Sequence, residues 1–318
     1  MLSSGMKISL ESLLKESKKA ILLGVGGGGD VVGTIPTARL LELFGIECVL
    51  GGLPWERFVY DPVPGPRTLD EIKNVKILCD TVWLANKDTK TTGGVRFAES
   101  GVAEIYGKEV LLVDITKGVL GVVEGLKKIL LELKADLLVG IDVGGDSLAF
   151  GNEEGLRSPL ADSIMLASFF ALRKEVKTLW GVLGYGSDGE LTGEEIGNAL
   201  SFVAREGGLL GAWGLTPEVV EELEMVTSKV PTEASRIPID CAKGEAGEKF
   251  IRGGMRKVLL SPVSTITFYL SPQVIYEEVS KPAKLVIETK SLEEANEVLH
   301  SVGLYTELDY ERDKEKER

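Results

Sequence analysis

Residues 20–30 read Ala-Ile-Leu-Leu-Gly-Val-Gly-Gly-Gly-Gly-Asp, an apolar run that ends in a glycine loop. A short continuous apolar run that ends in glycine predicts a buried strand of a parallel sheet covered on both faces. Residues 36–44 have helical character and stop at Gly45, with Thr34 as the expected N-cap and Pro36 in the first turn. A strand, a glycine loop and a helix N-terminus therefore follow one another. Backbone N–H groups there attract anions, and glycines let a ligand come close.

Apolar runs and helical patterns alternate along the rest of the chain. We expect strands at residues 46–50, 75–79, 110–113, 137–143 and 179–183, and further apolar segments at 258–260, 266–270 and 285–287. We expect a polar turn at 88–94, and helices at 6–19, 120–133, 159–174, after the capping box of Thr192 and Glu195, from Thr216 toward Ser228, and at 291–299. This alternation predicts an α/β fold, with a mostly parallel, doubly wound, Rossmann-like sheet and helices on both faces.

The chain shows no linker of Gly/Ser or Pro composition that would divide it. We therefore expect a single α/β domain over residues 1–318 with a C-terminal lobe. Residues 1–19 are expected to carry an N-terminal helix. Residues 310–318 are nearly all charged, which predicts a frayed tail.

Composition restricts the class of partner. Apolar and charged fractions of 44% and 27% are those of a globular protein, and the net charge is −13. Such an acidic chain is not expected to bind nucleic acid or an anionic membrane, whereas a small anionic ligand can still be held by local backbone dipoles. No apolar run reaches the roughly 18 residues of a membrane span. Three distant cysteines suggest neither a disulfide framework nor a metal knuckle, which favours a reducing, cytoplasmic location. A homo-oligomer is compatible with the sequence.

His300 is the single histidine of the chain. A Ser-His-Asp or Cys-His mechanism, or a histidine-rich metal site, would have to use it. It ends an amphipathic stretch near the C-terminus, where a structural position at a helix end is the favoured interpretation. Any catalysis is then expected to depend on carboxylates, Lys, Tyr or a metal.

Three expected strands are each followed by glycines and an aspartate, at residues 26–30, 144–146 and 186–188. Loops at the carboxyl ends of parallel strands share one edge of a sheet, so we expect these groups to meet in one crevice. Clustered carboxylates suit magnesium, and a carboxylate desolvated beside another can act as a general acid or base. The candidate catalytic residues are Asp30, Asp146 and Asp188, and the candidate ligands for Mg²⁺ are Asp142 and Asp146.

Residues 53–67 are rich in proline and mix aromatic with charged side chains, which favours an ordered loop over the crevice. Its arginines could supply positive charge, and Trp55 is either a stacking platform or an anchor in the core. The candidate ligand-binding residues of the whole chain are Gly26, Gly27, Gly28, Gly29, Thr34, Trp55, Arg57, Arg67, Gly144, Gly145, Ser147, Tyr185, Gly186 and Ser187. The basic turn at 252–256 could also bind an anion, although a simple turn is the favoured interpretation.

Known phosphate and nucleophile motifs fit imperfectly. Gly24, Gly26 and Gly29 match Gly-x-Gly-x-x-Gly, but Asp30 adjoins the third glycine, where a carboxylate would repel pyrophosphate. The second expected strand ends in Gly51-Gly52, where a dinucleotide-binding chain has an acidic residue for the ribose. A Walker loop would need a lysine before Thr34, and an acyl-hydrolase elbow would need glycine at position 185.

Five segments of the chain carry a resemblance to a known family: residues 23–30, 51–57, 61–67, 140–146 and 306–311. With its specific Leu-Pro-Trp-Glu-Arg stretch at 53–57, the chain resembles the family listed as domain of unknown function 1152. The resemblance spans nearly the whole chain and implies a full-length domain, a cytosolic setting and an archaeal-type protein. It implies no activity and supplies no catalytic residues.

The residues favour an enzyme that acts on a phosphorylated or nucleotide-like metabolite, as a transferase, hydrolase or lyase. Glycine loops would hold anionic groups, and aspartates would bind Mg²⁺ or move protons. Two alternatives stay open. One is an NAD(P)- or flavin-dependent oxidoreductase, suggested by the strand, glycine loop and helix. The other is a non-catalytic ligand-binding protein on the same fold.

Overall fold

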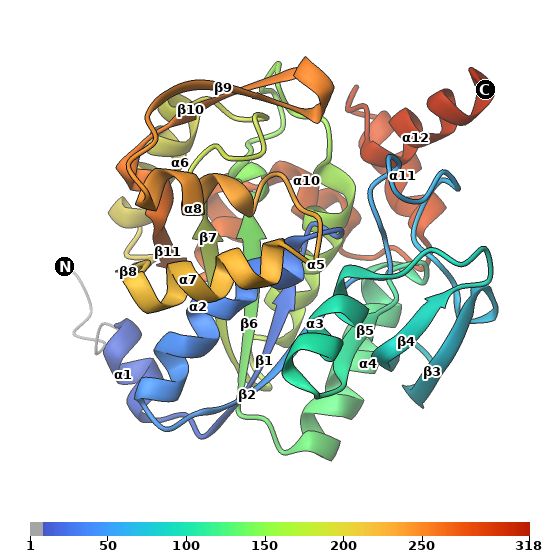
Figure 1. Ribbon diagram of the computed structural model, residues 1–318, viewed down its shortest axis with the longest axis horizontal. Coiled ribbons are helices and arrows are strands. Elements are labelled where there is room, and N and C mark those ends of the chain that lie inside the picture. The colour runs from blue at the N-terminus through green and yellow to red at the C-terminus, as the bar shows by residue number, and fades with distance from the viewer. Residues whose placement is uncertain (1–8) are drawn as a thin grey trace.

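A computed structural model describes residues 9–318 of the chain (Figure 1). Its centre is a nine-stranded sheet that mixes a parallel middle with antiparallel edges. In order across the sheet the strands are β3 (Ile72–Cys79), β4 (Val82–Thr91), β5 (Val110–Val113), β2 (Glu47–Gly52), β1 (Lys19–Gly24), β6 (Leu137–Val143), β7 (Lys177–Leu183), β11 (Ile266–Leu270) and β8 (Leu209–Gly214). Strands β5, β2, β1, β6 and β7 run parallel, which confirms the predicted α/β class.

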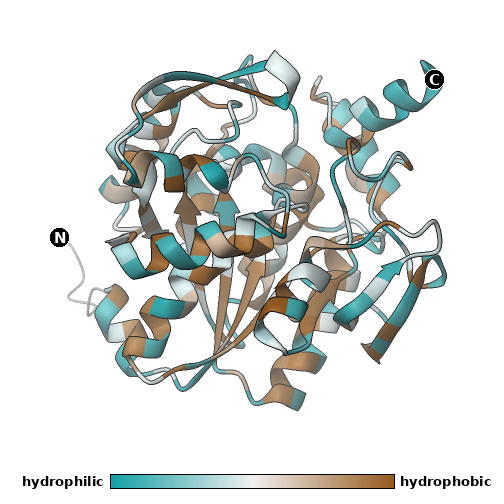
Figure 2. Cartoon of the chain, in the orientation of Figure 1, coloured by the Kyte–Doolittle hydropathy of each residue, from teal (hydrophilic) through white to brown (hydrophobic). Residues whose placement is uncertain are grey.

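Strands β1 and β6 lie at the middle of the sheet, with Leu22 opposite Val139. Both strands are apolar and buried, and Figure 2 shows the central strands as hydrophobic ribbons. Alternate side chains enter different cores: Ile21 packs in one cluster and Leu22 in another. Since a strand turns successive side chains to opposite faces, both faces of the sheet must be covered.

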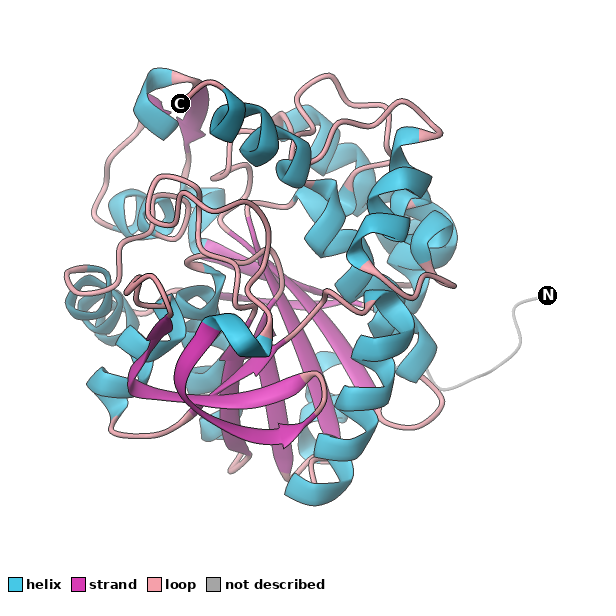
Figure 3. Cartoon of the chain, turned by 90° about the vertical axis from the view of Figure 1, so that its right-hand side faces the viewer, coloured by secondary structure: helices cyan, strands magenta, loops and turns pink. Residues whose placement is uncertain are grey.

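Helices cover both faces of the sheet (Figure 3). One core contains residues of α4 (Gly118–Leu133), α5 (Pro159–Leu172), α6 (Gly193–Arg205), α10 (Lys281–Val286) and α11 (Leu292–His300). The cores of the other face contain residues of α1 (Leu10–Lys15), α2 (Asp30–Leu43), α3 (Ala98–Tyr106), α7 (Pro217–Thr227) and α8 (Arg236–Ala242). The remaining helices are the short α9 (Pro272–Val274) and α12 (Glu307–Lys316). Among residues 9–318, no helix is both long and apolar enough to cross a membrane.

The chain leaves β1 toward β2 on one side of the sheet, whereas β6 and β7 lie on the other side. Loops therefore diverge at the carboxyl ends of β1 and β6, and this switch point is where open α/β sheets bind ligands. Two further segments lie beyond the same edge in Figure 1: α12, and a separate hairpin of β9 (Gly247–Ile251) and β10 (Arg256–Leu260).

Several predicted boundaries are wrong. Helix α2 begins at Asp30, with Gly29 as its N-cap, so Thr34 lies inside the helix instead of capping it. The predicted turn at 88–94 belongs largely to β4, which continues to Thr91. The predicted N-terminal helix is observed as α1, and residues 1–8 lie outside the described part of the chain.

The C-terminal third also differs from expectation. Strand β11 enters the main sheet between β7 and β8, and β8 itself, a segment rich in glycine, was missed. The segment 285–287 ends a helix, α10. In place of a frayed tail, Thr306 caps α12 with a capping box that includes Asp309. The prediction of a frayed tail rested on the charged composition of residues 310–318 alone. Leu308 of α12 is buried, so this helix packs against the protein.

Candidate functional site

Three buried aspartates meet at the carboxyl edge of β6. Asp142 lies near the end of β6, Asp146 begins the short turn after it, and Asp162 lies in the first turn of α5. Each offers a carboxylate oxygen that lies within 4.8 Å of those of the other two. All three side chains are almost inaccessible to solvent. We call Asp142, Asp146 and Asp162 the aspartate cluster.

Asp142 is held by the loop that follows it. Its Oδ1 accepts a hydrogen bond of 3.1 Å from the backbone N–H of Gly145, and its Oδ2 accepts one of 3.2 Å from that of Ser147. The Ser147 hydroxyl also donates to Asp142 and accepts from Trp180 Nε1. Burial nevertheless raises the pKa of Asp142 to about 7, with the charges of neighbouring aspartates adding to the effect.

Asp162 interrupts a helix that is otherwise apolar. Helix α5 is buried along most of its length, so a carboxylate in it needs a specific partner. The Oδ1 atom of Asp162 is buried and has no hydrogen-bond partner among the described residues. Burial and the charges of Asp142 and Asp30 raise the pKa of Asp162 well above its ordinary value. A carboxylate oxygen buried in this way is costly unless the group carries a proton or binds a cation.

Asp188 and Glu190 approach the cluster from the loop after β7. Asp188 Oδ2 is also buried without a hydrogen-bond partner among the described residues, and burial raises its pKa to about 6. Glu190 differs, because Arg256 lies 2.7 Å from its carboxylate and Ser158 donates to it. Although burial opposes ionisation, these partners keep the pKa of Glu190 below its ordinary value.

Asp30 occupies the first turn of α2, on the other side of the switch point. Its Oδ2 accepts a hydrogen bond of 2.9 Å from the backbone N–H of Gly26. Burial raises the pKa of Asp30 to about 6, and the charge of Arg57 opposes this shift. A Cβ on Gly26 would lie 2.8 Å from Asp30 Oδ2 and 3.4 Å from Asp162 Oδ2, so the Asp30 side chain lies close to the aspartate cluster.

Carboxylates outnumber cations around this crevice. The buried acids are Asp30, Asp142, Asp146, Asp162, Asp188, Glu190 and Glu307, and the arginines whose charges act on them are Arg57, Arg252 and Arg256. Burying several carboxylates together is costly unless protons or a cation neutralise them. Oxygen ligands at this spacing suit a hard divalent cation such as Mg²⁺. The aspartate cluster is therefore a fitting donor set for such an ion.

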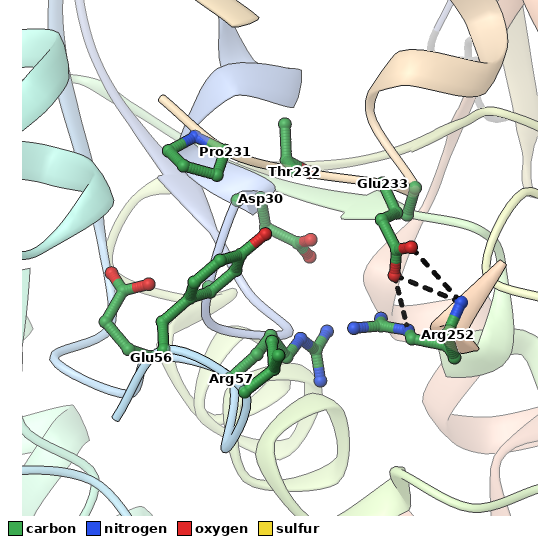
Figure 4. Close-up of a pocket in the computed structure, with 12 residues that line it drawn as sticks. Asp30, Glu56, Arg57, Pro231, Thr232, Glu233 and Arg252 are labelled. Atoms are coloured by element: carbon green, nitrogen blue, oxygen red, sulfur yellow. Dashed lines mark hydrogen bonds and ion pairs between the residues drawn. The ribbon is translucent and has the colours of Figure 1, made fainter. Parts of the chain in front are cut away.

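A pocket opens beside Asp30 (Figure 4). It is lined by Gly28, Gly29, Asp30, Glu56, Arg57, Val59, Tyr60, Pro231, Thr232, Glu233, Ala234 and Arg252. Its volume of about 20 Å³ is the room of about one water molecule, which is far too small for a dinucleotide. The pocket thus joins the loop after β1, the 53–67 loop and the β9–β10 hairpin.

Comparison with known proteins places the chain in a family. A family model described as protein of unknown function (DUF1152) matches residues 21–315, nearly the whole chain. The chain belongs to the DUF1152 family. No curated protein and no solved structure matches it. The matched range of this DUF1152 protein runs from β1 into α12 and contains every residue of the crevice.

The first glycine loop of the DUF1152 protein packs largely against two other segments of the protein, around Trp55 and Thr232. The backbone N–H of Gly28 donates to the Trp55 carbonyl over 2.7 Å. A Cβ on Gly29 would lie 2.2 Å from the Thr232 side chain, so only glycine fits there. Parts of the 26–29 loop therefore line the pocket, but its glycines serve close packing of protein segments as well as any ligand.

The two later glycine loops lie beside the aspartate cluster. Gly144 has a φ of +135°, and a Cβ on it would lie 2.1 Å from Asp188 Oδ2, so glycine brings these loops together. The backbone N–H of Gly186 donates to the Gly144 carbonyl over 2.7 Å. Ser187 is fully buried, with a hydroxyl that lacks a hydrogen-bond partner among the described residues. Tyr185 donates to the Gly193 carbonyl at the start of α6, away from the cluster.

Three predicted ligand-binding residues point into the protein instead. Thr34 is fully buried and donates to the Val31 carbonyl inside α2. Trp55 is buried and donates from Nε1 to Glu311 over 3.0 Å, so it anchors the 53–67 loop. Arg67 lies 3.1 Å from Asp61 and also binds carbonyls of its own loop. Each of these side chains thus has a polar partner within the DUF1152 protein.

Sequence reasoning missed the contribution of the C-terminal helix. Glu307 of α12 accepts hydrogen bonds from the backbone N–H groups of Leu160 and Ala161, which begin α5. Glu307 precedes the highly charged residues 310–318, and nothing in the local sequence distinguishes it from their exposed charges, although it is buried. Asp162 had a visible signal, since it is a carboxylate within an apolar helical run. His300 pairs with Asp309 at 2.6 Å and takes no part in the crevice.

Proposed function

We propose that this DUF1152 protein is a divalent-cation-dependent enzyme that acts on a phosphorylated or nucleotide-like small molecule. The observation that carries the proposal is the aspartate cluster at the switch point of the sheet, with three ligand atoms within 4.8 Å and a buried, unpartnered oxygen on Asp162. Mg²⁺ prefers a few carboxylates together with water and phosphate oxygens, which matches an incomplete protein cage of this kind.

The remaining acids would serve proton transfer. Asp30 lines the pocket, and Asp188 lies against the loop that carries the cluster, so both carboxyl groups are close to where a bound substrate would react. A bound cation supplies Lewis acidity and neutralises developing negative charge on a phosphoryl oxygen. Carboxyl groups with a pKa near 6 can give or accept a proton near neutral pH. This supports transferase, hydrolase or lyase chemistry.

The oxidoreductase alternative has weaker support. In a dinucleotide-binding fold the pyrophosphate rests on the helix N-terminus after β1. Here the Asp30 carboxylate occupies that turn and takes the Gly26 N–H, and the adjoining space is small. A non-catalytic ligand-binding protein remains an outcome that the experiment below distinguishes.

The test is a calorimetric titration of EDTA-treated protein with Mn²⁺ and Mg²⁺, followed by turnover assays. Wild-type protein should bind one of these ions, and Asp162→Asn should raise its Kd at least about tenfold. Asp80→Asn is the matched control, because Asp80 is exposed and distant from the cluster in the fold. Turnover is sought by mass spectrometry across phosphorylated metabolites with and without the ion.

Two results would overturn the proposal. Equal cation affinity in the wild type and Asp162→Asn would show that the aspartate cluster is not the binding site. Cation and phosphate-ligand binding without turnover of any phosphorylated metabolite would favour the ligand-binding alternative. A substrate consumed by the wild type with Mg²⁺, and not by Asp162→Asn, would support the proposal.

A further inference from the structure

Two arginines from distant parts of the chain face each other across the pocket. Arg57 comes from the loop after β2, and Arg252 lies at the tip of the β9–β10 hairpin, nearly 200 residues later. Figure 4 shows the two guanidinium groups pointing toward one another at the floor of the pocket. Two like charges at such a place repel each other unless an anion lies between them.

Neither arginine is fully used within the protein. Arg57 makes no side-chain hydrogen bond or ion pair within 4.0 Å to any described residue, although nearby acids raise its pKa despite burial. Arg252 meets Glu233 only weakly, at 3.8 Å from Nε, and that nitrogen is buried without a hydrogen-bond partner among the described residues. Burial and the charges of Arg57 and Arg256 lower the pKa of Arg252 to about 10. N–H groups of Arg57 and Arg252 are therefore available to bind an anion in the pocket.

Other groups at the pocket suit a tetrahedral anion. Gly28 and Gly29 line the pocket without side chains, so a small anion can approach the backbone closely there. Tyr60 adds a hydroxyl group that can donate to a phosphate oxygen, whereas the Thr232 hydroxyl already donates to Ser235. Guanidinium groups bind phosphate through two parallel hydrogen bonds.

We infer that Arg57 and Arg252 together bind the phosphate group of a phosphomonoester, beside Asp30. As a substrate subsite the inference rests on the proposed function, since the same phosphate would face the cation at the aspartate cluster. It narrows the substrate class to molecules with a terminal phosphate. The β9–β10 hairpin, which sequence reasoning treated as a simple basic turn, then supplies half of the phosphate site.

The test titrates EDTA-treated protein with inorganic phosphate by calorimetry and repeats the titration with Mg²⁺. Wild-type protein should bind phosphate without the cation, and Arg57→Gln and Arg252→Gln should each raise the Kd at least about tenfold. Arg205→Gln is the control, because Arg205 is an exposed arginine stacked on Phe202. Circular dichroism checks folding. Arg252 lies at an outer hairpin, so its variant remains informative if Arg57→Gln fails to fold.

The outcomes separate this inference from the proposed function. Phosphate affinity that is undetectable in the wild type, or equal in wild type and Arg252→Gln, overturns the subsite. Phosphate binding that depends on both arginines in a protein that binds no divalent cation supports the subsite and refutes the proposed function. Cation binding that survives in Arg252→Gln while phosphate binding is lost supports both the phosphate subsite and the proposed function.

Discussion

The carboxylate of Glu307 accepts a hydrogen bond of 2.8 Å from the backbone N–H of Ala161. A second bond of 3.0 Å comes from Leu160, so a residue near the end of the chain caps the start of α5. One residue further along α5 lies Asp162, a member of the aspartate cluster. The orientation of Asp162 therefore depends on a contact between segments about 145 residues apart.

Glu307→Ala should lower the free energy of unfolding by about 2 kcal/mol, because it leaves two N–H groups at a buried helix start without acceptors. It should also weaken divalent-cation binding, since Asp162 is then less firmly placed. Denaturant unfolding and calorimetry measure the two effects. Glu315→Ala, an exposed change in the same helix, is the control and should do neither. Unchanged cation affinity in a destabilised Glu307→Ala would limit the residue to a structural function.

Asp162→Asn should change stability in opposite directions with and without cation. In EDTA the variant is expected to be at least as stable as the wild type, because a buried, unpartnered carboxylate has been neutralised. At about 100 times the wild-type Kd, a cation that binds the native state should add about 2.7 kcal/mol to the wild type and none to Asp162→Asn. Thermal unfolding with Mn²⁺ measures this, and a destabilised variant in EDTA would contradict it.

The pair of buried glutamates Glu56 and Glu99 should make stability fall as pH rises. Burial raises the pKa of Glu56 to about 7, and burial with the Glu56 charge raises the pKa of Glu99 well above its ordinary value. Because the native state holds these protons more tightly than the unfolded state, their stabilising contribution is complete below about pH 4.5. It is lost as pH rises through 7.

Melting temperatures between pH 5 and pH 8 test this pair. The wild type should lose about 1 to 3 kcal/mol over this interval, and Glu99→Gln should lose less, because one of the two titrating carboxyls is gone. Glu132→Gln, an exposed change on α4, should follow the wild type. A wild type whose stability increases toward pH 8 would show that the pair is ionised at little cost.

Arg252→Gly should separate backbone conformation from ligand binding. Arg252 has a φ of +53°, in the left-handed region where residues with a side chain are strained by about 1 kcal/mol. The glycine variant should therefore be as stable as the wild type or slightly more stable, while its affinity for inorganic phosphate falls. Chemical denaturation and phosphate titration give the two readings, and retained phosphate affinity would refute the guanidinium's involvement.

Trp55→Phe should be a stability variant and not a binding variant. It removes the Nε1–H that donates to Glu311, a hydrogen bond to a buried carboxylate worth about 1 to 2 kcal/mol. Trp213→Phe, at a half-exposed position of β8, should cost less. If Trp55 stacks on a ligand ring instead, nucleotide affinity would fall at unchanged stability.

Local patterns in the sequence predicted the middle of the fold well. The apolar runs at β1, β6 and β7 are buried on both faces, so their composition alone identifies them as central parallel strands. Since such strands end at a common edge, the strand prediction also indicated that the loops carrying Asp146 and Asp188 lie side by side, and the Gly186 N–H donates to the Gly144 carbonyl. The capping box of Thr192 and Glu195 likewise depends on neighbouring residues and was confirmed.

Contacts between distant segments were beyond the reach of these patterns. Glu307 and Arg252 are ordinary surface residues by composition, and they enter the crevice because α12 and the β9–β10 hairpin fold back over the sheet. Strand β8 was missed although residues 209–214 are apolar, because the glycines within and around them are more typical of a turn. Trp55 was ambiguous because only the fold shows that its ring nitrogen has a buried partner, Glu311.

The position of Glu307 also bears on how this protein matures during synthesis. A ribosome releases the segments of the crevice in chain order, and residues 307–311 emerge after every other part of it. Until they dock, the beginning of α5 lacks its acceptors and Trp55 lacks Glu311. All nine strands of the main sheet precede this segment in the chain, and under the proposed function the protein would bind a cation only once the segment has left the exit tunnel.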